Sequence, residues 1–432
     1  MEIIKSNEKN FEEIKKILTK KSFDEVDEKA FESVRKIVSD VRIRGDEAVF
    51  EYTKKFDGVE LNEKNILVSE EEFMNAEKKA DEKVVESLKR AAENIKKFHL
   101  EQLPKSWITY REQGSILGQA IIAVEKVGIY VPGGTAAYPS SVLMNAIPAK
   151  VAGVGKIIMM SPTKTGELSP YVLIAAKLAG VDKIYKIGGA QAIAAMAFGT
   201  KKIPRVNKIT GPGNIFVTLA KKEVYGHCDI DMLAGPSEIL IIADENANPI
   251  YTAADMLSQA EHDPLACSIV ITTDLNLAEK VFSEVQNQLK KLPRKEIAES
   301  SIERNGLIIV AKNIDEAIEF ANISAPEHLE LLIDEPFSIL PKIKNAGAVF
   351  LGHYSPEPLG DYFAGPNHVL PTGGTAKFYS VLNVETFLKR MSLISYTKPA
   401  LLNVAEDIQR LAHAEGLDAH ANAIQKRMEG EK

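Results

Sequence analysis

Residues 238–272 read EILIIADENANPIYTAADMLSQAEHDPLACSIVIT, and this stretch decides the fold of the second half of the chain. The apolar runs at 238–243 and 268–272 have the length and composition of buried strands. The segment between them, 249–262, begins with proline and has apolar residues at helical spacing. A strand, a helix and a second strand in this order predict a parallel β-α-β unit.

The same alternation continues on both sides of this unit. Later strands are expected at 306–310, 328–333 and 348–351, with helices at 275–292 and 314–323. An earlier series of strands, which also alternates with helical stretches, is expected at 121–131, 156–160 and 183–187. The sequence therefore predicts an α/β protein with two doubly wound, incomplete Rossmann-like domains.

Both ends of the chain have helical patterns. Ser69 and Glu72 predict a capping box in the first hundred residues, which are rich in helical spacing. The helix-rich sequence after about Val381 predicts a tail that is too small for a core of its own. The expected divisions are a helical arm at 1–22, one α/β domain at 23–105 plus 237–380, another at 106–236, and a helical tail at 381–432.

The composition is that of an ordinary globular protein. The chain has 432 residues, 45% hydrophobic and 26% charged, and its net charge of -7 gives no reason to expect nucleic acid or an anionic membrane as partner. No apolar run approaches the roughly 18 residues that cross a bilayer, and the N-terminus lacks a signal-peptide core, so a cytoplasmic location is expected. Cys228 and Cys267 form no C-x-x-C pair, so any metal must bind through nitrogen and oxygen.

Two Glu-His dipeptides, Glu261-His262 and Glu327-His328, each place an imidazole beside a carboxylate. Imidazole is both a general base near neutral pH and a common zinc ligand, so the pairs predict a metal site and a proton-transfer site. Gln259 and His262 are three residues apart at the end of a predicted helix, so one ion could reach both side chains. A single helical histidine is more often a packed or surface residue, and only its neighbours change that interpretation.

Other candidate residues stand in irregular sequence. Asp361 lies in a glycine- and proline-rich loop of the kind that carries function, although an Asx turn would explain it too. Glu327-His328 follows Pro326, which predicts that the pair lies where a loop enters a strand. Judged by this pattern alone, the pair fits an active site and a solvated loop equally well.

Three glycine-rich turns follow predicted strands, although no clean G-x-G-x-x-G motif is present. Backbone amides at such turns can bind a pyrophosphate, and the alternative is that they are simply tight turns. The turns are Tyr130–Gly134, Gly188–Gln191 and Gly211–Asn214.

These motifs, with Ile230-Asp231, Ala234–Glu238 and the Glu415–Leu417 stretch before His420, resemble histidinol dehydrogenase over nearly the whole chain. The resemblance implies an enzyme that oxidises L-histidinol through enzyme-bound L-histidinal to L-histidine, the last step of histidine biosynthesis, using two NAD in succession. It implies one Zn²⁺ per subunit, bound by Gln259, His262, Asp361 and His420.

The resemblance also implies roles for further residues. Glu327 and His328 match the catalytic pair, and we assign the base that removes the hydroxyl proton to His328 and the activation of water to Glu327. The zinc and catalytic residues would lie in the 23–105 plus 237–380 domain, and NAD would bind the 106–236 domain. The expected NAD contacts are Tyr130, Gln191 and Asn214, and the expected substrate contacts besides the metal ligands are Ser237, His328, His368 and Glu415.

The family is also a homodimer with exchanged C-terminal tails, which would place Glu415 and His420 in the partner subunit's site. Two other classes remain open. An aldehyde dehydrogenase would need an activated cysteine, and Cys267 instead stands in an apolar run typical of a buried strand. A metal-dependent binding protein without turnover would not need the Glu327-His328 pair.

Overall fold

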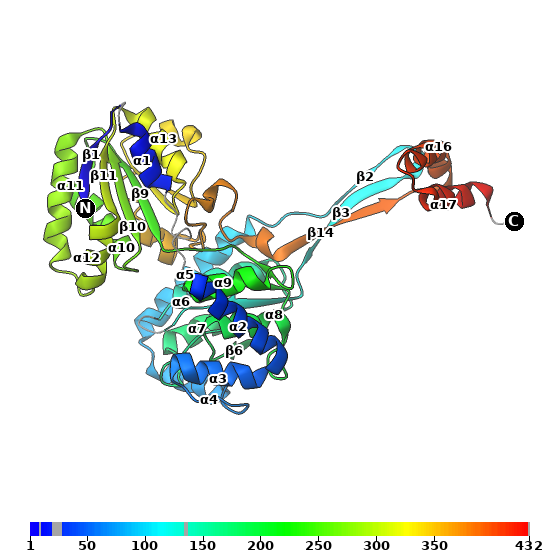
Figure 1. Cartoon of the computed structure of the whole chain (residues 1–432), viewed down its shortest axis with the longest axis horizontal. Coiled ribbons are helices and arrows are strands. Elements are labelled where there is room, and N and C mark those ends of the chain that lie inside the picture. The colour runs from blue at the N-terminus through cyan, green and yellow to red at the C-terminus, as the bar shows by residue number, and fades with distance from the viewer. Residues whose placement is uncertain (8–9, 20–27, 134–136, 431–432) are drawn as a thin grey trace. The chain divides into compact units, whose positions relative to one another are not determined.

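The computed structural model describes residues 1–7, 10–19, 28–133 and 137–430 (Figure 1). The chain divides into a larger unit, Met1–Gln102 with Val124–Phe387, and a smaller unit, Leu103–Ala123 with Leu388–Lys432. The expected boundary between residues 22 and 23, and Gly134 of the first glycine-rich turn, lie outside the described residues.

Among the described residues, the larger unit contains a six-stranded parallel sheet in the order β1-β11-β10-β9-β12-β13. The strands are β1 Glu2–Lys5, β9 Glu238–Ala243, β10 Cys267–Thr272, β11 Gly306–Val310, β12 His328–Leu332 and β13 Ala348–Leu351. The five later strands confirm the prediction to within one residue. β1 differs from the expected helical arm, because four residues that pair along the edge of a sheet are too few to show a clear period.

Alternate side chains of the central strands enter two different hydrophobic cores. Ile239 and Ile241 face the core under α10, α11 and α12, whereas Leu240 and Ile242 face the core under α1 and α13. These two groups of helices cover opposite faces of the sheet (Figure 1). A strand buried on both faces needs apolar residues at every position, which explains the unbroken apolar run in β9. The helices are α1 Phe11–Thr19, α10 Pro249–Ala260, α11 Leu275–Leu289, α12 Lys295–Asn305 and α13 Ile314–Ser324.

A second parallel sheet, of five strands within the described part of the chain, has the order β6-β5-β4-β7-β8. Its strands are β4 Lys126–Tyr130, β5 Lys156–Met160, β6 Lys183–Tyr185, β7 Lys208–Thr210 and β8 Asp229–Ile230. The helices that alternate with these strands along the chain are α6 Pro139–Val151, α7 Pro170–Ala179, α8 Gly189–Phe198 and α9 Ile215–Val224. β6 lies within the longer run expected at 183–187, whereas β7 and β8 were not predicted, because they stand in no apolar run long enough to show a pattern.

The early helices pack with this second sheet. Val41 from α2 and Tyr52 from α3 belong to the same core as Tyr130, and α4 and α5 pack against α7 and α6. The expected grouping of 23–105 with 237–380 differs from this packing, since an amphipathic helix does not reveal which sheet it covers. The helices are α2 Glu28–Arg44, α3 Asp46–Asp57, α4 Glu70–Lys79, whose capping box is confirmed, and α5 Glu82–Leu100.

The smaller unit contains an antiparallel sheet in the order β14-β3-β2. Its elements are β2 Trp107–Tyr110, β3 Ile116–Ala123, β14 Leu388–Ser395, α16 Lys398–Ala414 and α17 Asp418–Glu429. The single strand expected at 121–131 was wrong: β3 and β4 are separate strands in different units, and the break between them carries no glycine or proline. The tail contains β14 as well as the expected helices.

Short helical turns complete the described structure. They are α14 Pro336–Ile339, α15 Glu357–Leu359 and the turns η2 Glu112–Gly114, η3 Leu340–Lys342, η4 Gly360–Ala364, η5 Thr375–Lys377 and η6 Val384–Phe387. None of the described helices combines the length and the apolar character that a membrane crossing requires.

Candidate active site

Glu327 and His328 stand where the chain enters β12, as the sequence predicted. The backbone of Glu238, at the start of the neighbouring β9, contacts both side chains. Its N–H donates to Glu327 Oε2 at 2.9 Å, and its carbonyl oxygen lies 2.9 Å from His328 Nδ1. One residue therefore orients the carboxylate and the imidazole together.

The contact with Glu238 selects the tautomer of the neutral His328 ring. A carbonyl oxygen can only accept, so Nδ1 must carry the proton and Nε2 is left as the basic atom. Nε2 is buried, and among the described residues it has no hydrogen-bond partner. It lies 3.7 Å from Asp361 Oδ1. The geometry therefore presents Nε2 as the atom that can accept a proton from a bound molecule.

Burial and neighbouring charges shift the proton affinities in this cluster. Burial raises the pKa of Glu327 to about 8 and that of Glu238 to about 7. Burial works against a charged His328, but the carboxylates of Glu327 and Asp361 outweigh it and raise the histidine pKa to about 10. Burial would also raise the pKa of Asp361, but its interactions with His328 and His368 hold that pKa below its usual range. These groups share protons as one cluster.

Gln259 and His262 lie together at the end of α10. Gln259 is in the last turn, His262 follows the helix, and Gln259 Nε2 is 3.1 Å from His262 Nδ1, which confirms that they share a face. Gln259 Oε1 is buried and has no hydrogen-bond partner in the part of the chain that the structure describes. Burial lowers the pKa of His262 and so favours the neutral ring, which is the form that binds metals.

Asp361 is close enough to His262 for its charge to act on the ring. It lies in the helical turn η4 and not in the irregular loop that glycine and proline indicated. An unpaired amide oxygen, a neutral imidazole and an ionised carboxylate are a donor set that fits Zn²⁺. The residues present therefore fit the metal that the sequence led us to expect.

Glu357 is a site residue that the sequence analysis missed. One ligand atom each from His328, Glu357 and Asp361 lies within 4.8 Å of the others. Glu357 is 2% exposed, and its backbone N–H donates to Glu330 Oε1 at 2.7 Å. Its position four residues before Asp361, the spacing of one helical turn, could have indicated it.

His368 and Ser237 lie beside these groups. His368 Nδ1 is 3.0 Å from the backbone oxygen of Asp361, and its Nε2 is 3.4 Å from Ser141 Oγ in α6. Ser237 directly precedes Glu238 at the start of β9. The structure thus gathers the zinc and catalytic residues predicted in the larger unit, while Glu415, at the end of α16, and His420, in α17, belong to the smaller unit.

The three glycine-rich turns follow β4, β6 and β7, at the carboxyl end of the five-stranded sheet. β4 lies between β5 and β7, so the chain leaves it in one direction first and later returns to its other side. Such a switch point is where nucleotides bind open parallel sheets. Gln191 is 1% exposed, and neither polar atom of its amide has a partner within the described chain. Its unpaired amide fits a bound polar ligand.

Tyr130 and Asn214 are already engaged in local contacts. The Tyr130 hydroxyl accepts the N–H of Gly189 at 3.1 Å, and Asn214 Oδ1 accepts the N–H of Val217 at 3.2 Å as the cap of α9. Asn214 is exposed, so its NH₂ group can face a ligand. The two side chains therefore stabilise the conformation of the turns in which they lie.

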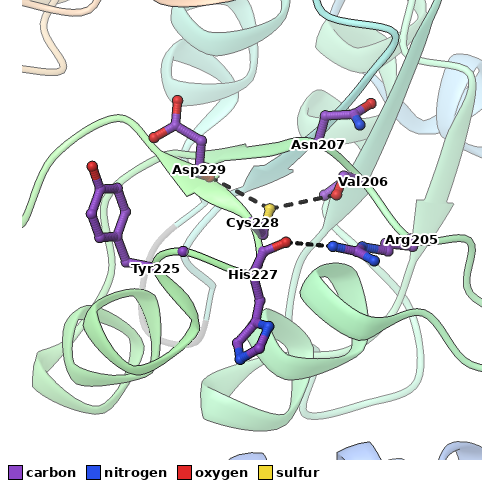
Figure 2. Close-up of a pocket in the computed structure, with 8 residues that line it drawn as sticks. Arg205, Val206, Asn207, Tyr225, His227, Cys228 and Asp229 are labelled. Atoms are coloured by element: carbon purple, nitrogen blue, oxygen red, sulfur yellow. Dashed lines mark hydrogen bonds between the residues drawn. The ribbon is translucent and has the colours of Figure 1, made fainter. Parts of the chain in front are cut away.

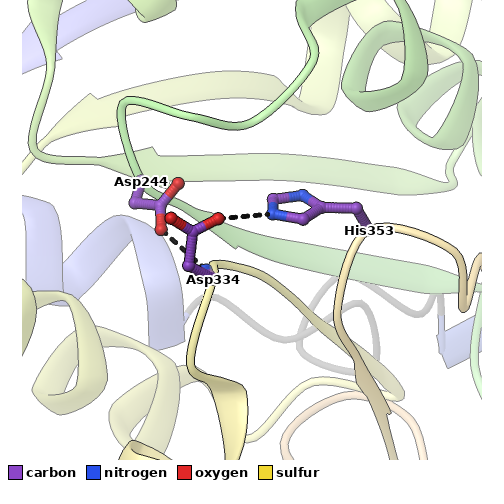
Figure 3. Close-up of side chains that lie close together, drawn as sticks. All are labelled: Asp244, Asp334 and His353. Carbon is purple, nitrogen blue, oxygen red and sulfur yellow. Dashed lines mark hydrogen bonds and ion pairs between the residues drawn. The ribbon is translucent and has the colours of Figure 1, made fainter.

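Asp244, Asp334 and His353 form a second cluster (Figure 3). They follow β9, β12 and β13, whereas His328 stands at the start of β12. Asp334 Oδ1 is 3.3 Å from His353 Nε2, and Asp244 Oδ2 accepts the N–H of Asp334 at 2.9 Å. The side chain of Asp334 is 62% exposed. These contacts join the loops after three strands, which is a structural role.

The cysteines do not resemble nucleophiles. Burial raises the pKa of each thiol to about 12, so both stay protonated at neutral pH. Cys228 lines a cavity of about 320 Å³ with Arg205, Asn207, Tyr225 and Asp229, and its sulfur faces the backbone oxygens of Val206 and Asp229 (Figure 2). The cavity contains none of the predicted site residues. The geometry therefore disfavours thiol catalysis.

Comparison with known proteins agrees with this site. The family model described as histidinol dehydrogenase matches residues 20–428. Histidinol dehydrogenase of Heliobacterium mobile is 57% identical over 413 residues, covering 95% of this chain and 96% of its own, and that of Bacillus cereus is 55% identical over 427 residues, covering 98% and 99%.

A crystal structure of histidinol dehydrogenase from Elizabethkingia anophelis has a TM-score of 0.93 and 38% identity, covering 99% of this chain and 98% of its own. The similarity therefore extends over both units of the chain and over the whole length of the relatives. The chain belongs to the histidinol dehydrogenase family.

Proposed function

We propose that this chain is a zinc- and NAD-dependent oxidoreductase that converts L-histidinol through L-histidinal to L-histidine, the last step of histidine biosynthesis. The observation that carries the proposal is the buried, unpartnered Nε2 of His328 beside Asp361, with the ring fixed by Glu238. Membership in the histidinol dehydrogenase family supports the choice of substrate.

Gln259, His262 and Asp361 would hold Zn²⁺, with His420 as the fourth ligand. When bound, the ion would hold and orient the imidazole and the amine of the substrate. Glu357 lies against Asp361 and His328 and is available to bind the substrate amine. Ser237 and His368 line the same region and would contact the substrate, as would Glu415.

His328 must first lose the proton that its raised pKa keeps on the ring. In the first oxidation, Nε2 of the neutral ring then accepts the hydroxyl proton while a hydride leaves the same carbon, which produces the aldehyde. Tyr130, Gln191 and Asn214 would contact NAD, which supplies the hydride acceptor for both oxidations. The unpaired Gln191 amide supports this assignment. His328 must lose its proton before the second oxidation begins.

In the second oxidation, Glu327 takes a proton from water as the oxygen attacks the aldehyde, and it passes this proton to the former carbonyl oxygen, which gives a hydrate. Burial raises the pKa of Glu327 to about 8, so its ionised form is a stronger base than an exposed glutamate. His328 then accepts the hydroxyl proton of the hydrate while the second hydride leaves. The product is the carboxylic acid, L-histidine.

We also propose a cytoplasmic homodimer with exchanged tails, in which Glu415 and His420 complete the site of the partner subunit. The sheet and helices of the smaller unit expose apolar side chains that a second copy could cover: Trp107 at 52%, Ile108 at 53%, Tyr110 at 73%, Ile394 at 76% and Leu411 at 67%. Apolar side chains gathered on one small unit are typical of an interface.

The proposed function is tested by following NADH formation from L-histidinol before chelation, after chelation and after Zn²⁺ is returned. We expect activity that is lost and then restored. NADH formation from an aldehyde alone, insensitive to chelation, would favour a thiol-dependent aldehyde dehydrogenase. Substrate binding without NADH formation would favour a protein that binds but does not turn over.

A further inference from the structure

Lys221 of α9 and Asp231, which follows β8, form a buried ion pair. Their side chains are only 3% and 1% exposed. Removing two charges from water costs about as much as their attraction returns, so such a pair is a poor source of stability. A role in setting local geometry is the better explanation.

The pair binds both backbone polar groups of Gly211. Asp231 Oδ2 accepts the N–H of Gly211 at 2.8 Å, and Lys221 Nζ donates to the Gly211 carbonyl oxygen at 3.1 Å. Asp231 Oδ1 also accepts the N–H of Met232 at 2.6 Å. The ion pair therefore fixes the orientation of this one residue from two sides.

Gly211 is the first residue of the turn between β7 and α9, and only glycine can adopt the backbone conformation that this position requires. Its φ is +111°, and a Cβ at this position would overlap the backbone oxygen of Tyr130. The turn is thus pressed against the end of β4, at the switch point of the sheet. A small rotation of Gly211 would move the N–H groups of Gly213, Asn214 and Ile215, at the N-terminus of α9.

We propose that Lys221 and Asp231 are positioning residues for the nucleotide, acting through Gly211. The inference rests on the proposed NAD-dependent function. The Lys221 ammonium group is buried and engaged by Asp231 and Gly211, so it acts on the turn and is not itself a phosphate ligand. The pair holds the Gly211–Asn214 turn in an orientation in which the N–H groups of Gly213 and Asn214 can meet a pyrophosphate.

The test compares the affinity for NADH with the kinetics of histidinol oxidation. Asp231→Asn leaves Lys221 without its charge partner and can prevent folding, so the principal variant is the double substitution Lys221→Met with Asp231→Leu, which removes both charges. The control is Lys208→Met with Asp229→Leu, because that pair joins the starts of β7 and β8 at 2.8 Å, at the ends of these strands away from Gly211 and Asp231.

We expect the Lys221/Asp231 double variant to raise the Kd for NADH and the KM for NAD by about tenfold or more, while kcat and the KM for histidinol change little. The control should bind NADH like the wild type. Both variants are first shown to be folded by circular dichroism.

A folded double variant with the wild-type Kd for NADH and the wild-type KM for NAD would overturn this inference and leave the proposed function standing. Equal losses in the KM values for NAD and histidinol would show a general structural role and would overturn it too. If the wild type bound no NADH at all, the proposed function and this inference would fall together, so the two failures are distinguishable.

Discussion

His328 Nδ1 lies 2.9 Å from the backbone carbonyl oxygen of Glu238, 90 residues earlier in the chain. This contact leaves Nε2 as the base. His328→Asn removes the base from both oxidations, so we expect kcat to fall by about 10²- to 10⁴-fold with histidinol and with histidinal as substrate. Steady-state assays with each substrate measure this. A loss confined to one of the two substrates would contradict the shared role of Nε2.

Glu327 has a different expected effect, because only the aldehyde step needs an activated water. Glu327→Gln keeps an oxygen that can accept the Glu238 N–H, but it removes the acceptor for the proton of water. Histidinal oxidation should therefore fall much more than histidinol oxidation. Glu335→Gln, at an exposed carboxylate near the end of β12, is the control and should change neither. Equal losses of histidinol and histidinal oxidation in Glu327→Gln would contradict the proposal that Glu327 acts only in the aldehyde step.

Loss of the metal should abolish activity without unfolding the protein. His262→Ala removes one proposed ligand, and we expect no detectable histidinol oxidation and a change in the free energy of unfolding of less than about 2 kcal/mol. Zinc content by atomic absorption and a thermal melt measure both effects. His353→Ala, in the second histidine-aspartate cluster, is the control and should keep its zinc and its activity. Full activity in a zinc-free protein would refute the metal's role.

Replacing both cysteines should leave turnover near normal. The pKa of each thiol is about 12, so below that pH the protonated, unreactive form predominates and native protein should react slowly with iodoacetamide. Cys228→Ala with Cys267→Ala should cost about 1–2 kcal/mol of stability through lost packing. Selective loss of histidinal oxidation in the folded variant would instead support a thiol mechanism.

Exchanged tails predict complementation between two inactive variants. In a heterodimer of His262→Ala with His420→Ala, one site carries both lesions and the other carries neither. Random mixing makes half of the dimers heterodimers, so about a quarter of wild-type activity should return in a closed two-fold dimer. Refolding the two variants together, with heterodimers verified by mass, measures it. Activity that stays at the level of the separate variants would mean that each tail serves its own subunit.

The long apolar strands were predictable because each needs apolar residues on both faces. β9 and β12 are examples, and their starts carry Glu238 and the Glu327-His328 pair. The two-residue strand β8 and the edge strand β1 were not predictable. Their extended conformation comes from pairing with neighbouring strands and not from any internal sequence pattern.

The same distinction holds for the site. Motifs with a local pattern, such as Gln259 to His262, indicated their own proximity. The role of Glu238 depends on backbone groups that contact residues far along the chain, and a backbone contact of this kind leaves no mark on the residue type that makes it. Such roles become visible only when the strands are assembled.

The central claim is that one site carries out both oxidations, and the number of NADH molecules formed per L-histidinol consumed tests it most directly. With a limiting amount of histidinol and excess NAD, we expect two NADH per histidinol and L-histidine as the only product, with neither formed after zinc is removed. One NADH per histidinol with free histidinal accumulating, or two NADH from the zinc-free protein, would contradict the account.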